Sequence, residues 1–128
     1  MIVLDTCTLL WLTSEPEALS GKAIRTIRQH RGAVFVSAIS AFEIGQKAAR
    51  KKLTLPVSVS DWFPRALRLH GLLECPVTGD IAARATELPD LHRDPFDRLL
   101  IATAQSCRWK LITPDPLIHQ YPDSRAVW

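Results

Sequence analysis

Two acidic residues follow short apolar runs that have the character of buried strands. Asp5 comes directly after residues 2–4, and Asp115 comes two residues after a second run at 111–113. In an open parallel sheet, ligands bind outside the carboxyl ends of the strands, so acids in these positions are expected to share one end of the sheet. An acid placed directly after a core strand is costly unless it has a partner. Asp5 is therefore the hardest of the acids to explain as purely structural.

Three further acids are expected at the same end of the molecule. Glu43 lies in the helix predicted after the strand at 34–36, at the edge of its apolar face, and Asp94 and Asp97 open the helix predicted to end near residue 108. Like charges packed together repel, and some take up protons unless a cation neutralises them. Carboxylates without histidine or cysteine partners suit Mg²⁺ or Mn²⁺. One or two such ions lower the pKa of a bound water and clamp both oxygens of an in-line phosphoryl displacement, which cuts phosphodiester bonds without a protein nucleophile.

Each acid also has a structural explanation. Asp94 before Pro95 suits a helix N-cap, and Asp97 would complement the helix dipole and complete a capping box. Asp115 lies in a Thr-Pro-Asp-Pro segment, which is typical of a turn, and Glu43 alone indicates little. Taken singly, each acid favours the structural explanation. Four acids at matching ends of an alternating strand–helix chain favour a metal site.

The order of the apolar segments predicts an α/β fold. Short runs of strand character alternate with segments of helical periodicity, and nothing indicates a hairpin. Strands are expected at 2–4, 34–36, 72–75 and 111–113, with a short edge strand at 126–128. Helices are expected after Thr6 or Asp5, Ser20, Ser37 or Ser40, Thr78 and Asp94, and at about 60–70, where Pro64 is tolerable only in the first turn. This pattern predicts three layers: a central parallel sheet of four to five strands with helices on both faces.

Composition excludes several classes of protein. The 128 residues, 47% hydrophobic and 23% charged, fit a single domain spanning 1–128, and the longest apolar runs are too short to span a bilayer. The start of the sequence carries no signal-type segment, so we expect a cytoplasmic protein with no membrane partner. Three widely spaced cysteines indicate neither a disulfide framework nor a zinc site. The formal charge of +3 is mild, but the convergence of the acids leaves the remaining surface more basic, which suits a phosphate backbone.

Four segments of the chain resemble the motifs of PIN-domain ribonucleases, and within that group those of the VapC toxins of bacterial type II toxin–antitoxin pairs. The matching segments are Ile2-Val3-Leu4-Asp5-Thr6, residues 36–44 around Glu43, His92-Arg93-Asp94-Pro95-Phe96-Asp97-Arg98 with the apolar run after it, and Leu111-Ile112-Thr113-Pro114-Asp115. The segment from 92 is the most specific of the four. The resemblance covers essentially the whole chain and implies a single PIN domain.

The resemblance implies a metal-dependent endoribonuclease in which four acids hold Mg²⁺ or Mn²⁺ and a metal-activated water cleaves RNA. The implied metal-binding and catalytic acids are Asp5, Glu43, Asp97 and Asp115. Asp94 then becomes an N-cap or a residue that supports the ligands. Thr6 and Thr113 are expected to orient neighbouring carboxylates. Arg98 is expected either to contact RNA or pair with an acid, or to have a surface or intramolecular role.

The same resemblance implies partners. VapC proteins usually form homodimers, cut transfer RNA or ribosomal RNA, and are held inactive by a small VapB antitoxin with a DNA-binding domain. Such an antitoxin lays a tail over apolar grooves and often inserts a basic side chain at the acidic site. Trp11, Leu55 and Trp62 are candidate contacts for the tail, and the competing interpretation makes them core residues.

Two other phosphoryl-transfer classes fail at their own motifs. A haloacid-dehalogenase-type phosphatase requires a second Asp two residues after the first, where this chain has Cys7. A phospho-receiver domain requires a lysine after a strand, and Lys110 instead precedes one. No Gly-rich phosphate loop is present. The remaining alternative is a catalytically silent PIN-like module that binds RNA or protein, which the presence of all four acids disfavours.

Overall fold

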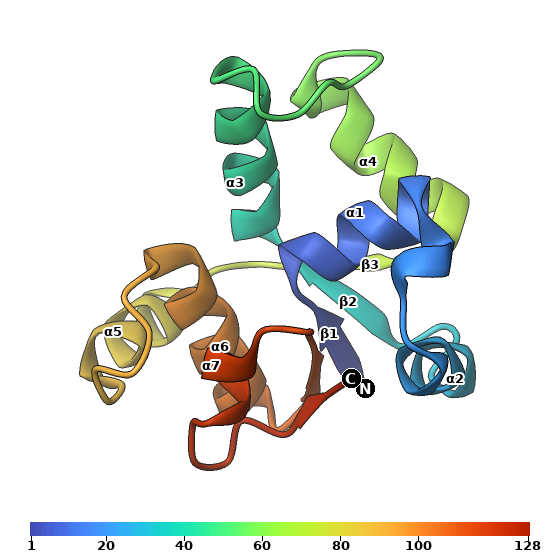
Figure 1. Cartoon of the computed structure of the whole chain (residues 1–128). Helices are drawn as coiled ribbons and strands as arrows, with labels where there is room; N and C mark the ends of the chain where they lie inside the picture. Colours follow the sequence, from blue (N-terminus) through green and yellow to red (C-terminus); the bar gives the residue numbers. More distant parts are fainter.

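The computed structural model describes residues 1–128 and contains one five-stranded sheet (Figure 1). The strands are β1 (Ile2–Leu4), β2 (Val34–Ser37), β3 (Leu73–Cys75), β4 (Lys110–Ile112) and β5 (Ala126–Val127). Their order across the sheet is β3-β2-β1-β4-β5, and all four neighbouring pairs are parallel. The predicted parallel sheet is confirmed, and β1 and β4 lie side by side at its centre.

At least one helix lies between each pair of successive strands along the chain. They are α1 (Thr6–Ser14), the 3₁₀ turn η1 (Pro16–Ala18), α2 (Gly21–Gln29), α3 (Ala38–Ala49), α4 (Val59–His70), α5 (Gly79–Glu87), α6 (Pro95–Cys107) and α7 (Pro116–His119). Side-chain oxygens cap six of them, from Asp5, Ser20, Ser37, Thr78, Asp94 and Asp115. These residues satisfy the free N–H groups of a first helical turn, which is why local sequence located five of the six starts. The sixth, at Asp115, was expected to be a turn and instead caps the short helix α7.

Three local expectations need correction. Strand β3 begins at Leu73, one residue late, because the Leu72 N–H bonds back to the Leu67 carbonyl after Gly71 ends α4 in the left-handed conformation. Strand β4 ends before Thr113, whose hydroxyl accepts the Asp115 N–H and starts a turn. Pro64 lies in the second turn of α4 rather than the first, at an exposed position where water can replace the lost backbone bond.

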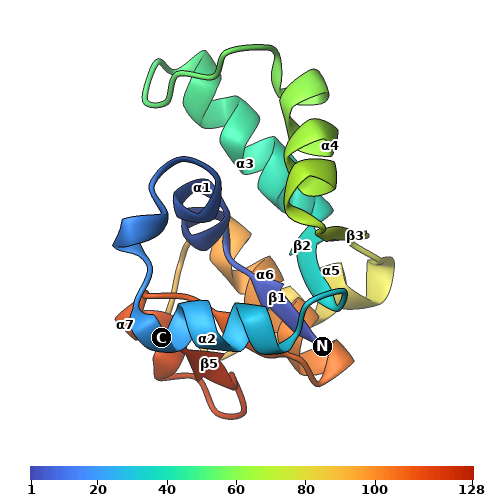
Figure 2. The ribbon, with the colours of Figure 1, turned by 90° about the vertical axis from the view of Figure 1, so that its right-hand side faces the viewer.

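Alternating side chains of the short strands build a core on each face of the sheet. Ile2 and Leu4 point to one face, where they pack with residues of α1, α3 and α4. Val3 points to the other face, where it packs with Leu100 and Ile101 of α6. Figures 1 and 2 show the resulting layers, with α1, α3 and α4 on one side of the sheet and α5, α6 and α7 on the other. The predicted arrangement of helices on both faces is confirmed.

None of the helices combines the length and apolar character that crossing a membrane requires. The segments that carry Asp5, Glu43 and Asp115 begin at the carboxyl edge of the sheet. The chain leaves β1 at Asp5, β2 at Ser37 and β4 at Ile112, and each time it turns from there into a helix start or a loop at the same edge.

Candidate metal centre

Asp5 is buried at the point where β1 becomes α1. Its exposed fraction is 4%, and its Oδ1 accepts the Thr8 N–H at 2.7 Å. Burial raises the pKa of the Asp5 carboxyl because the charged form loses water, and the charge of Glu43 raises it further, whereas hydrogen bonds from Thr113 and Thr8 oppose the rise. The predicted role of Thr113 in orienting this carboxylate stays a prediction.

Glu43 projects from α3 with one oxygen paired and one unpaired. Its Oε2 lies 3.3 Å from the Lys47 Nζ one turn further along the helix, whereas its Oε1 is buried without any hydrogen-bond partner. The residue as a whole is 9% exposed. An unpaired buried carboxylate oxygen is costly, and it marks a place where a cation would be favourable.

Asp97 lies in the first turn of α6, where the charges of the other acids act on its carboxyl group. Burial raises its pKa to about 7, and the charges of Asp94, Glu43 and Asp5 add to the rise, whereas His92 lowers it. Asp5 and Glu43 therefore act on Asp97 through their charge.

Asp115 completes the set from the start of α7. Its Oδ1 caps that helix by accepting the Leu117 N–H at 2.8 Å. Its own N–H donates to the hydroxyl of Thr113 at 3.1 Å. The Thr113 side chain also lowers the pKa of Asp5, so this threonine influences the acids that follow both central strands.

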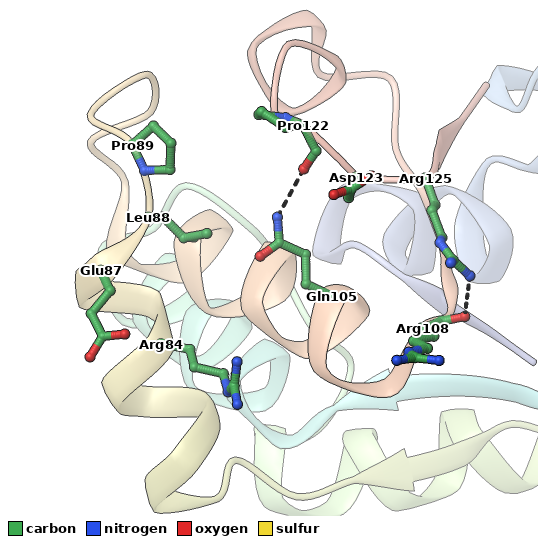
Figure 3. Close-up of a pocket in the computed structure, with 9 residues that line it drawn as sticks. All are labelled: Arg84, Glu87, Leu88, Pro89, Gln105, Arg108, Pro122, Asp123 and Arg125. Atoms are coloured by element: carbon green, nitrogen blue, oxygen red, sulfur yellow. Dashed lines mark hydrogen bonds between the residues drawn. The ribbon is translucent and has the colours of Figure 1, made fainter.

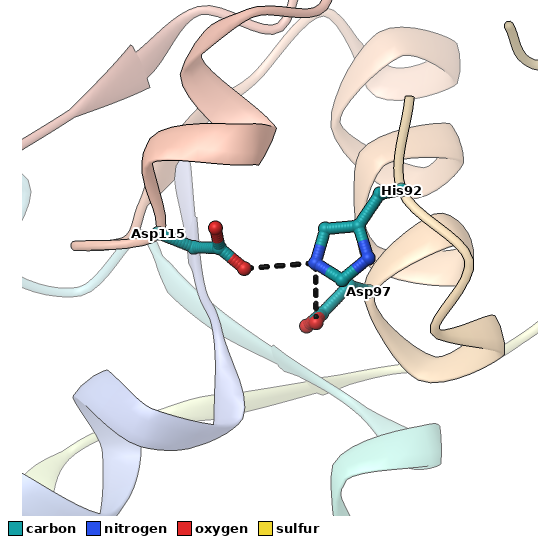
Figure 4. Close-up of side chains that lie close together, drawn as sticks. All are labelled: His92, Asp97 and Asp115. Carbon is teal, nitrogen blue, oxygen red and sulfur yellow. Dashed lines mark hydrogen bonds and ion pairs between the residues drawn. The ribbon is translucent and has the colours of Figure 1, made fainter. Parts of the chain in front are cut away.

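His92 joins Asp97 to Asp115 (Figure 4). Its Nε2 is 3.0 Å from Asp97 Oδ2 and 2.8 Å from Asp115 Oδ2, and its exposed fraction is 9%. Ligand atoms of these three residues all lie within 4.8 Å of one another. The Nδ1 atom accepts the Asp94 N–H at 3.2 Å, so the ring proton belongs on Nε2, which donates to the two carboxylates.

Sequence reasoning missed His92 as a site residue. It stands in a loop, where neither helical nor strand periodicity places a side chain, and its two carboxylate partners are 5 and 23 positions further along the chain. The signal that was available is its position within the most specific of the four family-like segments. The same ring prevents the expected capping box, because the Asp94 N–H donates to His92 rather than to Asp97.

Arg98 holds the backbone of the His92 loop rather than pairing with an acid. Its guanidinium donates to the carbonyls of Ala85, Leu88, Pro89 and His92 at 2.9–3.1 Å. The Tyr121 hydroxyl adds a second anchor, since it accepts the His92 N–H at 2.7 Å. Of the roles left open for Arg98, the structure favours the intramolecular one.

The other two supporting residues have structural partners. The Thr6 hydroxyl bonds to the Ser40 hydroxyl at 2.9 Å, which joins α1 to α3, and its role in orienting a carboxylate stays a prediction. The Asp94 carboxylate accepts the Phe96 N–H at 2.9 Å and caps α6. Asp94 acts on the site through its charge, which raises the pKa of Asp97.

Cys7 lies close to the same acids. Burial, together with the charges of Asp5, Glu43 and Asp97, raises the pKa of its thiol to about 11, and Lys47 only partly opposes this. A thiol with this pKa stays protonated at neutral pH, so it does not supply a nucleophile.

Two hollows differ in their relation to the acids. A cleft of about 140 Å³ opens beside Glu43 and Asp94 and has a basic rim, formed by Lys47, Arg50 and Lys52. A larger hollow of about 640 Å³ lies at the far end of α6 (Figure 3). Its Arg125 and Gln105 are bonded to the carbonyls of Arg108 and Pro122, and none of the acids of the candidate metal centre lines it. Of these two hollows, the smaller cleft is therefore the one that adjoins the candidate metal centre.

Comparison with known proteins agrees with this geometry. The chain matches the PIN domain family over residues 2–123. It is 34% identical over 130 residues to a protein named Ribonuclease VapC22 from Mycobacterium tuberculosis, with 99% of this chain and 98% of the relative covered.

Solved structures share the fold. A toxin–antitoxin complex from Klebsiella pneumoniae has a chain that matches with a TM-score of 0.68 at 21% identity, covering 100% of this chain and 97% of the other. VapBC2 from Rickettsia felis, solved with a promoter DNA fragment, matches with a TM-score of 0.72 at 13% identity, covering 99% and 98%. DNA-bound VapBC from Salmonella typhimurium matches with a TM-score of 0.70 at 14% identity, covering 99% and 98%.

Proposed function

We propose that this chain, which belongs to the PIN-domain family and within it to the VapC type, is a metal-dependent endoribonuclease toxin. The observation that supports metal dependence best is the buried, unpaired Oε1 of Glu43, which lies in the common field of Asp5 and Asp97. A divalent cation would neutralise these carboxylates and bind the oxygen that the protein leaves without a partner.

The residues present fit such an ion. Asp5, Glu43, Asp97 and Asp115 would hold it, and an all-oxygen set of this kind suits Mg²⁺ or Mn²⁺. When bound, the ion would supply an activated water and stabilise the charge that develops on the phosphate. Asp97 must lose its proton to bind a cation, because its pKa in the metal-free protein is about 7.

The side chains around the acids would orient them. His92 donates from Nε2 to Asp97 and Asp115 and so fixes the directions of two carboxylates that start different helices. Arg98 and Tyr121 hold the His92 backbone, and the Thr113 hydroxyl accepts the Asp115 N–H. Residues of this kind maintain ligand geometry without reacting.

RNA as the substrate agrees with the charge distribution around the site. Asp5 and Glu43 are buried, and Asp97 and Asp115 are partly buried, whereas the rim of the adjoining cleft carries Lys47, Arg50 and Lys52. A polyphosphate backbone would be attracted to this rim through charge and counterion release and would bring a phosphodiester to the acids. The named relative is a ribonuclease, in keeping with this assignment.

The decisive experiment is an RNA cleavage assay. Purified protein, freed of any partner, is incubated with total cellular RNA and Mg²⁺ or Mn²⁺, beside an Asp5→Asn variant and an EDTA control. Discrete fragments that vanish in both controls are expected, and the mapped ends would name the target in transfer RNA or ribosomal RNA. Intact RNA with a folded, metal-bound protein would contradict nuclease activity and favour the silent binding module.

We also propose a VapB-like antitoxin as the natural partner and a homodimer as the assembly. All three structural neighbours described above are toxin–antitoxin complexes. Leu55 and Trp62 pack against the core but stay partly exposed, and the ring of Trp11 lies 5.8 Å from that of Trp128. Alanine at Trp11, Leu55 and Trp62 should weaken binding of the cognate antitoxin tail in a pull-down, and binding indifferent to all three changes would argue against these contacts.

A further inference from the structure

Two phenylalanines each directly precede an acid of the candidate metal centre. Phe42 precedes Glu43 on α3, and Phe96 precedes Asp97 on α6. Successive helical side chains point about 100° apart, so each ring projects away from the neighbouring acid. The two rings nevertheless meet, with centroids 5.7 Å apart and planes inclined at 42°.

The Phe42 ring is not a core side chain. It is 57% exposed, and it is the one aromatic residue among the large apolar side chains that the surface exposes. Phe96 is only partly buried and lines the cleft that also contains Glu43 and Asp94. The exposed Phe42 ring therefore lies beside the cleft of the candidate metal centre. Packing in the apolar core does not explain an aromatic side chain in this position.

Cations flank this aromatic pair. Lys47, Arg50 and Lys52 line the same cleft as Phe96. Aromatic rings beside a row of Lys and Arg are the combination that binds single-stranded nucleic acid, because the rings stack on bases while the cations bind phosphates.

We infer that Phe42 and Phe96 form a stacking subsite for an unpaired nucleobase next to the scissile phosphate. Lys47, Arg50 and Lys52 bind the phosphates on one side of that nucleotide. This inference rests on the proposed nuclease function. It identifies the residues that would make the protein bind an unstacked base in preference to a base held in a duplex.

A second copy of the chain is a poorer occupant of the same surface. A two-fold contact centred on Phe42 would bring the basic rim of one copy towards the same rim of the other. Like charges placed together oppose association, whereas an RNA backbone complements them. The charges around the aromatic pair therefore favour RNA.

The test measures RNA binding separately from cleavage. Fluorescence anisotropy in EDTA, where cleavage is blocked, follows a labelled ten-nucleotide uridine RNA and the same RNA paired to its complement. The wild type should bind the single strand more tightly than the duplex. Phe42→Ala should weaken single-strand binding about tenfold, the loss expected for one base–aromatic stack. Phe42→Trp, which keeps an aromatic face, should retain the wild-type affinity.

Two controls separate stacking from other effects. Phe42→Leu keeps apolar bulk without a π face and should behave like Phe42→Ala. Leu69→Ala removes another exposed apolar side chain, 79% exposed on α4 beside a different hollow, and should bind RNA like the wild type. Unchanged RNA affinity in Phe42→Leu, or a dimer lost in Phe42→Ala at unchanged RNA affinity, would overturn the inference.

Failure of the inference and failure of the proposed function give different results. Cleavage of RNA by the wild type together with wild-type RNA affinity in Phe42→Ala would remove the stacking subsite and leave the nuclease. Binding of RNA that depends on Phe42, without cleavage under any metal condition, would remove the nuclease and keep the subsite.

Discussion

The candidate metal centre has two halves that the protein treats differently. In the Asp97–Asp115 half, the His92 ring bridges both carboxylates, and further protein groups fix the ring. In the Asp5–Glu43 half, one Glu43 oxygen is buried without a partner, and Lys47 holds the other. The first half is oriented by donors of the chain itself, whereas the second leaves one carboxylate oxygen without any hydrogen-bond partner. We interpret the contrast as a difference in role. The carboxylates of Asp97 and Asp115 are held in position, whereas the Glu43 carboxylate keeps an oxygen free to bind.

The largest effect is expected from breaking the Asp5–Glu43 half. Asp5→Asn keeps an oxygen that can accept the Thr8 N–H but removes a charge that would bind the ion. Cleavage should fall by more than about 100-fold, beyond the range typical of residues that only support a metal ligand. Single-turnover RNA cleavage measures this loss, and circular dichroism checks that the fold is kept. Residual activity within tenfold of the wild type would exclude Asp5 from the chemistry.

The proton of Asp97 should make the metal-free protein less stable as pH rises. The folded pKa is about 7 and the ordinary value is 3.8, so between these values the folded state holds a proton that the unfolded state has lost. The free energy of unfolding should therefore decrease from pH 4 to pH 7 by about 2–4 kcal/mol through this group. Urea unfolding in EDTA at several pH values measures the slope.

The control for this dependence of the free energy of unfolding on pH is the variant Asp97→Asn. It cannot titrate, so its stability should fall less over the same pH interval, with the remaining fall assigned to Asp5, whose pKa is raised for the same reason of burial. A divalent ion binds the unprotonated carboxylate, so Mg²⁺ or Mn²⁺ should restore wild-type stability above pH 7. Identical slopes for the two proteins would exclude Asp97 as the source.

The next largest effect is a loss of stability, expected when Arg98, which anchors the His92 loop, is removed. Arg98→Ala leaves four carbonyls without their charged donor, and we expect a loss of about 2–3 kcal/mol in the free energy of unfolding. Chemical denaturation measures the change, and Arg84→Ala, which breaks an exposed ion pair with Asp80, is the control. Equal stability of the two variants would contradict a structural role for Arg98.

Breaking the bridge within the Asp97–Asp115 half should have a smaller effect on function than loss of Asp5. His92→Ala should weaken Mn²⁺ binding and cleavage about tenfold, and His92→Gln should recover part of the loss by donating an N–H. Calorimetry follows ion binding, and His70→Ala, on the exposed end of α4, is the control. Nitrogen coupling to bound Mn²⁺ in electron spin-echo spectra would instead identify His92 as a direct ligand and contradict a purely positioning role.

The smallest effect is expected from Lys47→Ala. Its ion pair with Glu43 is half-exposed, and exposed pairs contribute about 0–1 kcal/mol. Thermal unfolding should therefore change little, although loss of a cation at the cleft rim should reduce the salt dependence of RNA binding. A stability loss like that of Arg98→Ala would show that the pair holds Glu43 in place.

Local chemistry was sufficient for most of the fold. Asp5, Ser20, Thr78 and Asp94 were located as helix starts because a cap acts on the next few residues of its own chain. The parallel sheet followed from apolar runs that alternate with helices. The strand ends were displaced by one residue where a hydrogen bond reaches beyond its own element, as at Leu72 and Thr113.

The sequence by itself determined the strand–helix order and most of the helix caps, and it singled out four acids as candidate ligands. The tertiary structure decided which polar partners those acids have. His92 reaches Asp115 across 23 positions, Thr6 bonds to Ser40 across 34, and Arg98 turns to carbonyls of a neighbouring helix and loop. Such contacts depend on how helices pack on the sheet, whereas capping and periodicity act over one or two turns of the same chain.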